Sequence, residues 1–97
     1  MILRRMFIAA ITGLVLTPIS ALAADKLNVV ATTGMIVDTA ARVGGDAVEV
    51  VGLMGAGVDP HGYRQTRSDI VAMTRADVVL WNGLFLEAQM EAFFMTL

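Results

Sequence analysis

Short runs of apolar and β-branched residues alternate with helical patterns along most of the chain, and this alternation constrains the fold more than any other feature. The strand-like runs occupy residues 27–32, 47–53 and 77–81. Helical patterns follow them, with the last running to the end of the sequence. Strands separated by helices of about 10–15 residues pair in parallel, with right-handed crossovers that place helices on the faces of the sheet. We therefore predict an α/β fold built from parallel β-α-β units.

Local signals place the helix boundaries. Gly44 and Gly45 follow the first helical pattern, and glycine after the last turn commonly ends a helix. Thr66 and Asp69 match the capping box of a helix start. We expect the last helix to begin near Leu84. The apolar residues expected on one face are Ile36, Ala40 and Val43 in the first helix, and Leu86, Met90, Phe93 and Leu97 in the last.

The first 23 residues have the pattern of an export signal. Arg4 and Arg5 precede an apolar stretch at residues 6–16, and small residues occupy positions 21 and 23. A charged start, an apolar core of about 7–15 residues and an A-x-A ending are typical of a secretory signal peptide. We predict a signal peptide at residues 1–23, cleaved after Ala23.

A membrane anchor is the alternative for this segment, because residues 6–24 are nearly as long as the ~20 residues of a transmembrane helix. Thr12 and Pro18 interrupt the run, and the chain has no cysteine to carry a lipid. We therefore expect a soluble periplasmic protein that keeps residues 24–97. Its last helical pattern stops without a capping signal, so we expect this region to be a truncated α/β lobe.

Composition excludes several functions. The net charge is −2 and the isoelectric point is near 5.1, whereas a nucleic-acid-binding domain carries a basic patch. We therefore expect no nucleic-acid partner. The absence of cysteine rules out a thiol nucleophile and a cysteine zinc finger. Ser20 and Ser68 are the only serines, one in the signal and one at a helix start, which argues against a serine hydrolase.

The best candidate site lies in the loop after the second strand-like run. Ligands of open parallel sheets bind at the carboxyl ends of the strands, and this loop contains the only histidine, His61. Pro60 stiffens the turn, so the imidazole would be presented to a transition metal at little ordering cost. We expect Asp59 to accept hydrogen bonds from loop amides. A single histidine can equally be an ordinary surface residue, and one ligand does not complete a metal site.

Other candidates have simpler explanations. Glu87 and Glu91 lie one helical turn apart, which could suggest acid-base carboxylates, but we assign them to a solvated helix face. The glycines at residues 52–57 follow a strand without the order of a dinucleotide-binding motif.

Several stretches together resemble the zinc/manganese-type periplasmic solute-binding proteins of ABC importers. Gly-Ala-Gly-Val-Asp-Pro-His-Gly-Tyr is followed by a Thr-Arg-Ser-Asp-Ile helix start and by a strand that ends in Asn-Gly-Leu-Phe-Leu-Glu. The likeness covers residues 27–91, and its most specific stretches are 29–36, 55–63, 66–70 and 76–87.

The resemblance implies two α/β lobes joined by a long helix, with one metal ion held between them. The histidine of the Asp-Pro-His turn is the family's first ligand, and it matches His61. The other ligands, histidines and a carboxylate, would follow Leu97. The chain would then be the signal peptide and roughly the first quarter of such a protein, less than one lobe.

The resemblance also implies a function. The protein would capture Mn²⁺ or Zn²⁺, with Fe²⁺ as a third candidate, and deliver it to an ABC permease in the membrane. It would not be an enzyme and would need no organic cofactor. We favour Mn²⁺ from the Asp-Pro-His-x-Tyr and Asn-Gly-Leu-x-Leu-Glu sequences. A small exported enzyme that uses His61 with a carboxylate and a membrane-anchored structural fragment are the alternatives.

Overall fold

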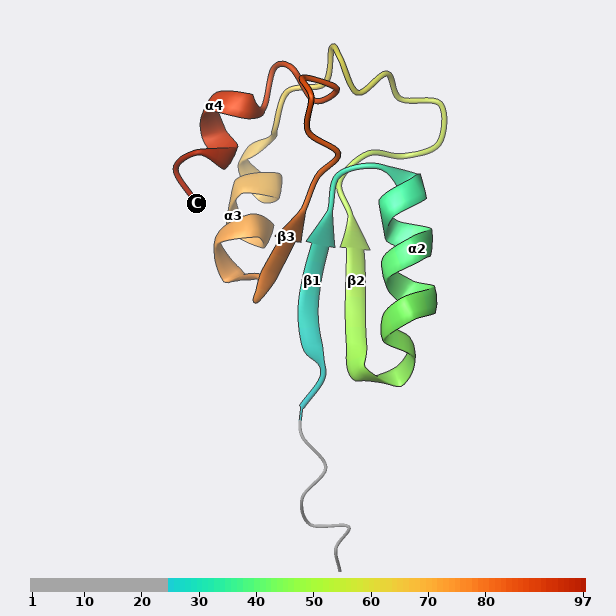
Figure 1. Cartoon of the computed structure of the whole chain (residues 1–97). Helices are drawn as coiled ribbons and strands as arrows, with labels where there is room; N and C mark the ends of the chain where they lie inside the picture. Colours follow the sequence, from blue (N-terminus) through green and yellow to red (C-terminus); the bar gives the residue numbers. More distant parts are fainter. Residues whose placement is uncertain (1–24) are drawn as a thin grey trace, which may run out of the picture.

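The computed structural model describes residues 25–97, which form a three-stranded parallel sheet with helices on both faces (Figure 1). The strands are β1 (Leu27–Ala31), β2 (Val48–Gly52) and β3 (Val78–Leu80), in the order β2-β1-β3. The parallel β-α-β organisation predicted from the sequence is confirmed. The predicted signal peptide and its cleavage site lie outside the described residues.

The central strand β1 supplies much of the core. Val29, Val30 and Ala31 are all at most 5% exposed, because β1 pairs with β2 on one side and with β3 on the other. Continuous burial of successive residues is typical of a parallel strand covered on both faces. At its beginning, β1 is joined to β3 by Asn28, whose N–H donates to Asp77 Oδ2 at 2.8 Å and whose carbonyl accepts from Asp77 N at 2.9 Å.

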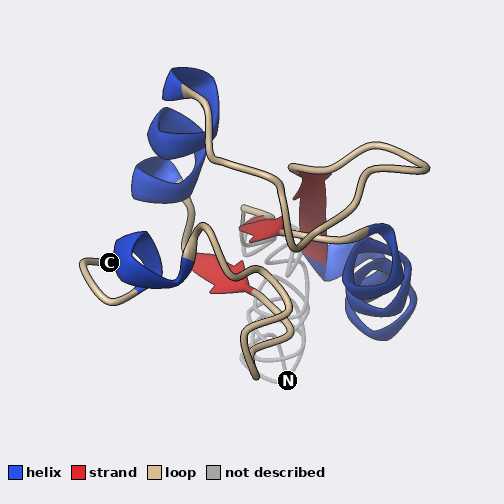
Figure 2. Ribbon diagram, turned by 90° about the horizontal axis from the view of Figure 1, so that it is seen from above, coloured by secondary structure: helices blue, strands red, loops and turns tan. Residues whose placement is uncertain are grey.

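Helix α2 (Gly34–Gly44) packs against β1 and β2, and the short η2 turn (Gly45–Ala47) leads from it into β2. Seen from above, α2 lies on one side of the strands and the other helices lie on the opposite side (Figure 2). The packing is close enough to require glycine at position 52, where a Cβ would lie 2.8 Å from a methyl group of Val37.

The predicted end of α2 is confirmed, but part of its predicted apolar face is wrong. Gly45 follows the helix with φ 52°, a left-handed conformation that glycine adopts without strain. Val43 is 84% exposed. The turn at Gly45 brings Val48 against Gly44, where no side chain would fit. The packed face therefore runs through Gly44, and Val43 points to solvent.

Helix α3 (Arg67–Arg75) begins at the predicted capping box. The Thr66 hydroxyl accepts from Asp69 N at 3.2 Å, and the Asp69 carboxylate accepts from Thr66 N at 2.9 Å. Met73, on the inner face of α3, is 2% exposed and joins the main apolar cluster with Val30. The other buried members of this cluster are Met54, Met90 and Phe94.

The last predicted helix is shorter than expected. Helix α4 covers only Glu91–Phe94, and residues 84–90 form turns. Leu84 and Phe85 have φ of 52° and 60°, which no right-handed helix contains. Met90 is buried as predicted, but Leu97 is 51% exposed. The early helix start predicted near Leu84 is therefore wrong.

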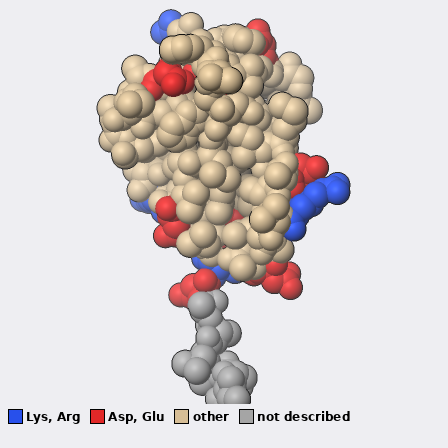
Figure 3. Space-filling model, in the orientation of Figure 1, with Lys and Arg blue, Asp and Glu red and all other residues tan. Residues whose placement is uncertain are grey.

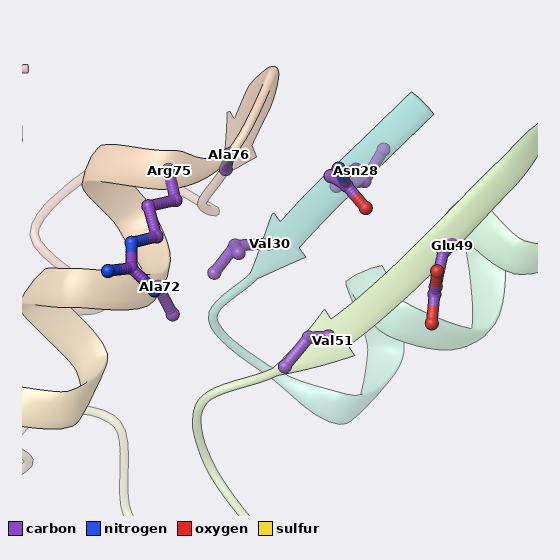
Figure 4. Close-up of a pocket in the computed structure, with 8 residues that line it drawn as sticks. Asn28, Val30, Glu49, Val51, Ala72, Arg75 and Ala76 are labelled. Carbon is purple, nitrogen blue, oxygen red and sulfur yellow. The ribbon is translucent and has the colours of Figure 1, made fainter. Parts of the chain in front are cut away.

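One stretch of the sheet remains open. Beside α3, a groove of about 240 Å³ lies over the face of β1 and β2 opposite α2 (Figure 4). Val30 and Val51 lie on its sheet side, and Ala72, Arg75 and Ala76 lie on its helix side. Within residues 25–97, no helix is long and apolar enough to cross a membrane.

Candidate metal-binding site

The loops that leave the three strands all lie at the same end of the sheet (Figures 1 and 2). They are the turn from β1 into α2, the loop at residues 53–66 after β2, and the turns at residues 81–90 after β3. In parallel α/β sheets this is the end at which ligands bind. His61 is in the second of these loops, so the structure places it at the predicted end of the sheet.

His61 is exposed and is held by a neighbouring carboxylate. Its side chain is 65% exposed, and its Nδ1 lies 3.2 Å from Asp59 Oδ1. A carboxylate oxygen only accepts hydrogen bonds, so the proton of a neutral imidazole must be on Nδ1. The lone pair is then on Nε2, which is the arrangement of a metal-ligating histidine whose other ring nitrogen is bound to a carboxylate.

The predicted role of Asp59 is confirmed. Its Oδ1 accepts the His61 backbone N–H at 3.0 Å as well as the contact from the ring. The backbone hydrogen bond, followed by the side-chain bond, lowers the pKa of Asp59 below its ordinary value of 3.8. Asp59 therefore stays ionised at neutral pH, and both of its contacts fix the orientation of His61.

Hydrogen bonds hold the His61 loop near both of its ends. At its start, Met54 is buried and its N–H donates to the Thr32 carbonyl at 3.0 Å. At its end, the Tyr63 hydroxyl donates to the Asp69 carboxylate and lies 3.3 Å from the Leu53 carbonyl. The hydrogen bond to Asp69, with partial burial, raises the pKa of Tyr63 to about 12. His61 thus lies on a loop with two fixed ends.

A shallow cavity of about 430 Å³ separates the His61 loop from the other two loops. Val58 and Pro60 line it from the His61 loop, Thr33 and Met35 from the start of α2, and Leu86 from the turns after β3. The groove beside α3 is away from these loops, so the cavity at the carboxyl ends of the strands is the one that adjoins the candidate site.

Glu87 contradicts the prediction of a solvated carboxylate. It is completely buried, and its Oε2 accepts hydrogen bonds from the Thr32 hydroxyl and from Asn82 N, both at 2.7 Å. Its Oε1 accepts from Gly83 N at 3.3 Å. Glu91 is half-buried, and its Oε2 is buried without a hydrogen-bond partner among the described residues. The two carboxylates therefore do not share a solvated helix face.

The turn that contains Glu87 also exposes two large apolar side chains. Leu84 is 99% exposed and Phe85 is 70% exposed, and both have positive φ. Met35, at the start of α2, is 69% exposed at the same end of the sheet. Most of the face in Figure 3 is uncharged, with charged atoms mainly round its margins.

Within residues 25–97, His61 is the predicted metal ligand, and it is exposed at this end of the sheet. No group of three or more histidine, cysteine or acidic side chains within residues 25–97 could hold a metal ion together. A transition-metal site usually takes three or more protein ligands. One imidazole is fewer ligands than such a site takes.

The sequence matches a family of metal-uptake proteins. The family described as ZnuA, "Zinc-uptake complex component A periplasmic", matches residues 29–96. The chain belongs to the ZnuA family. The match includes the last three residues of β1, all of β2 and β3, and the His61 loop. It confirms the resemblance inferred from the Asp-Pro-His and Asn-Gly-x-x-Leu-Glu sequences.

Relatives of the ZnuA family have names that specify different metals. The chain is 54% identical over 39 residues to the manganese-binding lipoprotein MntA of Bacillus subtilis, covering 40% of this chain and 13% of MntA. It is 49% identical over 45 residues to the zinc-binding protein TroA of Treponema pallidum, covering 46% and 15%. It is 47% identical over 38 residues to the iron-binding protein YfeA of Yersinia pestis, covering 39% and 12%.

The fold of the ZnuA family is confirmed by a solved structure. The periplasmic zinc-binding protein TroA of Treponema pallidum superposes with a TM-score of 0.72 at 43% identity, over 74% of this chain and 26% of TroA. The matched stretches are thus a small part of each relative's length.

Proposed function

We propose that the protein captures a divalent transition metal, Mn²⁺ or Zn²⁺, in the periplasm and delivers it to an ABC permease. The observation that carries this proposal is the presentation of His61, whose Nδ1 faces a carboxylate while most of the side chain is open to solvent. Membership of the ZnuA family supports it, as do the manganese, zinc and iron named for the relatives.

In this proposal His61 is one ligand, and the other ligands come from segments that follow Leu97. Residues 24–97 are then part of the first lobe, and residues 1–23 are an export signal removed after Ala23. No covalent bond is made or broken, so the protein acts as a carrier and not as an enzyme.

The choice of metal follows from the chemistry of the remaining ligands. Oxygen ligands suit Mn²⁺, whereas imidazoles suit Zn²⁺ and Fe²⁺. We favour Mn²⁺ from the Asp-Pro-His-x-Tyr and Asn-Gly-Leu-x-Leu-Glu sequences. Competition between Mn²⁺ and Zn²⁺ for the same site tests this choice directly.

Calorimetric titration of the protein expressed from its complete gene tests the function. We expect micromolar or tighter binding of Mn²⁺ or Zn²⁺, and more than about 100-fold weaker binding by His61→Ala, since losing a ligand costs more than the 10–100-fold loss from an outer-shell change. Arg64→Ala is the matched control, because Arg64 is an exposed residue of the same loop. Equal affinities of the wild type and His61→Ala would remove His61 from the site.

A further inference from the structure

Glu87 is a fully buried carboxylate in a segment that is otherwise largely exposed. Burying a carboxylate is costly unless hydrogen bonds replace the water it loses. Its three bonds, from the Thr32 hydroxyl, Asn82 N and Gly83 N, replace that water. An apolar side chain could have filled this part of the core. What the carboxylate adds is the set of hydrogen bonds that joins these groups.

Those groups belong to two different strand ends. Thr32 directly follows β1, and Asn82 and Gly83 follow β3. A second bond joins the same two turns, from Asn82 Nδ2 to Thr33 Oγ1 at 3.1 Å. Glu87 therefore fixes the turn before α2 relative to the turn after β3.

Thr32 connects this arrangement to the His61 loop. Its side chain is bound by Glu87, and its carbonyl accepts the N–H of Met54, the second residue of the loop. Leu86, next to Glu87, lines the same cavity as Val58 and Pro60 of the His61 loop. The position of the Glu87 carboxylate thus sets both the start of that loop and the opposite wall of the cavity.

We propose that Glu87 is a positioning residue for the metal site, acting through Thr32 and the Met54 amide to hold the loop that carries His61. This inference rests on the proposed function. In this role Glu87 does not contact the metal. Its effect is geometric: without the carboxylate, the loop can shift relative to the turns after β1 and β3, and Nε2 of His61 no longer keeps one position.

Four variants of the protein expressed from its complete gene test this role. Glu87→Gln keeps one acceptor oxygen and replaces the other by an NH2 donor, so the bonds from Asn82 N and Gly83 N, which go to different oxygens, cannot both be kept. Thr32→Val removes only the hydroxyl, and Thr32→Ser restores it. Glu91→Gln is the matched control, because the buried Oε2 of Glu91 has no hydrogen-bond partner among residues 25–97. Each variant is titrated with Mn²⁺, and the absorption spectrum of bound Co²⁺ reports ligand geometry.

We expect Glu87→Gln and Thr32→Val to bind Mn²⁺ about tenfold more weakly, the lower end of the loss found for outer-shell changes. Both should alter the Co²⁺ spectrum. Thr32→Ser and Glu91→Gln should keep wild-type affinity and spectrum. Hydrogen exchange of the metal-free protein should show faster exchange at residues 54–63 in the two weakened variants, with α3 unchanged.

The outcomes separate this inference from the proposed function. If the wild type does not bind Mn²⁺, Zn²⁺ or Co²⁺, the proposed function fails and this inference fails with it. If the wild type binds and His61→Ala does not, while Glu87→Gln and Thr32→Val keep full affinity and an unchanged Co²⁺ spectrum, only the role of Glu87 is overturned. If Glu87→Gln does not fold, the comparison of Thr32→Val with Thr32→Ser decides.

Discussion

The His61 loop and the Glu87 turn lie at the same end of the sheet but are built in opposite ways. His61 is exposed, and its side-chain partner, Asp59, is two residues away. Glu87 is fully buried, and its hydroxyl partner, Thr32, is 55 residues away. The first region presents an imidazole to solvent, and the second joins two turns through a buried carboxylate.

The largest effect should come from Glu87→Ala. Each buried donor left without an acceptor costs about 1–3 kcal/mol, so we expect the free energy of unfolding to fall by about 3 kcal/mol or more. Denaturant unfolding followed by circular dichroism measures it. Asp59→Ala should change this free energy by less than about 0.5 kcal/mol, as is usual for a surface residue. If Glu87→Ala and Asp59→Ala lost similar amounts of the free energy of unfolding, the two regions would not differ in their contribution to stability.

A smaller loss in the free energy of unfolding is expected for Tyr63→Phe. This variant tests how firmly the far end of the His61 loop is held. The variant loses the hydroxyl bond to Asp69 but keeps the capping box of α3. We expect a loss of about 1–2 kcal/mol in the free energy of unfolding, since hydrogen bonds to charged groups are worth about 1.5–3 kcal/mol and this site is partly open to water.

Tyr63 also predicts an alkaline transition. Its pKa in the folded protein is raised from 10.0 to about 12. The folded state therefore binds this proton more tightly than the unfolded state, so the stabilisation is complete below pH 10 and is lost as the pH rises towards 12. The difference in tyrosinate absorbance between the wild type and Tyr63→Phe should have its midpoint near pH 12. A midpoint near pH 10 would mean that Tyr63 is not bound to Asp69.

The smallest effect should come from Asp59→Asn. The amide oxygen can still accept the His61 N–H, so the free energy of unfolding should change by less than about 0.5 kcal/mol. Metal affinity should fall by roughly tenfold or less, because a neutral amide polarises the imidazole less than a carboxylate does. Because the pKa of Asp59 is lowered below 3.8, the contribution of its carboxylate to the free energy of unfolding is lost only as the pH falls below 3.8. Calorimetric titration at neutral pH measures the change in affinity.

The parts of the fold that depend on neighbouring residues could be predicted from the sequence. The three strands, the end of α2 at Gly45 and the capping box at Thr66 all follow from patterns within a few residues. The loop that carries His61 also follows from local sequence, since Pro60 and the surrounding glycines exclude regular structure. The contact between Asp59 and His61 is local as well.

The rest depended on partners distant in the sequence. The helical spacing of Glu87 and Glu91 predicts a solvated helix face, and nothing near Glu87 in the sequence indicates the Thr32 hydroxyl. The same carboxylate binds the amides of Asn82 and Gly83, which holds the chain in turns where the apolar spacing predicted a helix. The Asn-Gly pair a few residues before Glu87 is a turn signal, and it is the one local feature that could have indicated turns here.

The order of the strands has a consequence for the assembly of the molecule. Among residues 25–97, β1 is the first strand along the chain and the central one in the sheet. As the chain is synthesised, β1 has no partner until β2 follows it, and its second edge stays open until β3 is complete. Closing such long loops is slow. The Glu87 bond, which spans both crossovers, can form only after the sheet is complete. The hydrogen bonds of the Glu87 carboxylate are therefore expected to form late in folding.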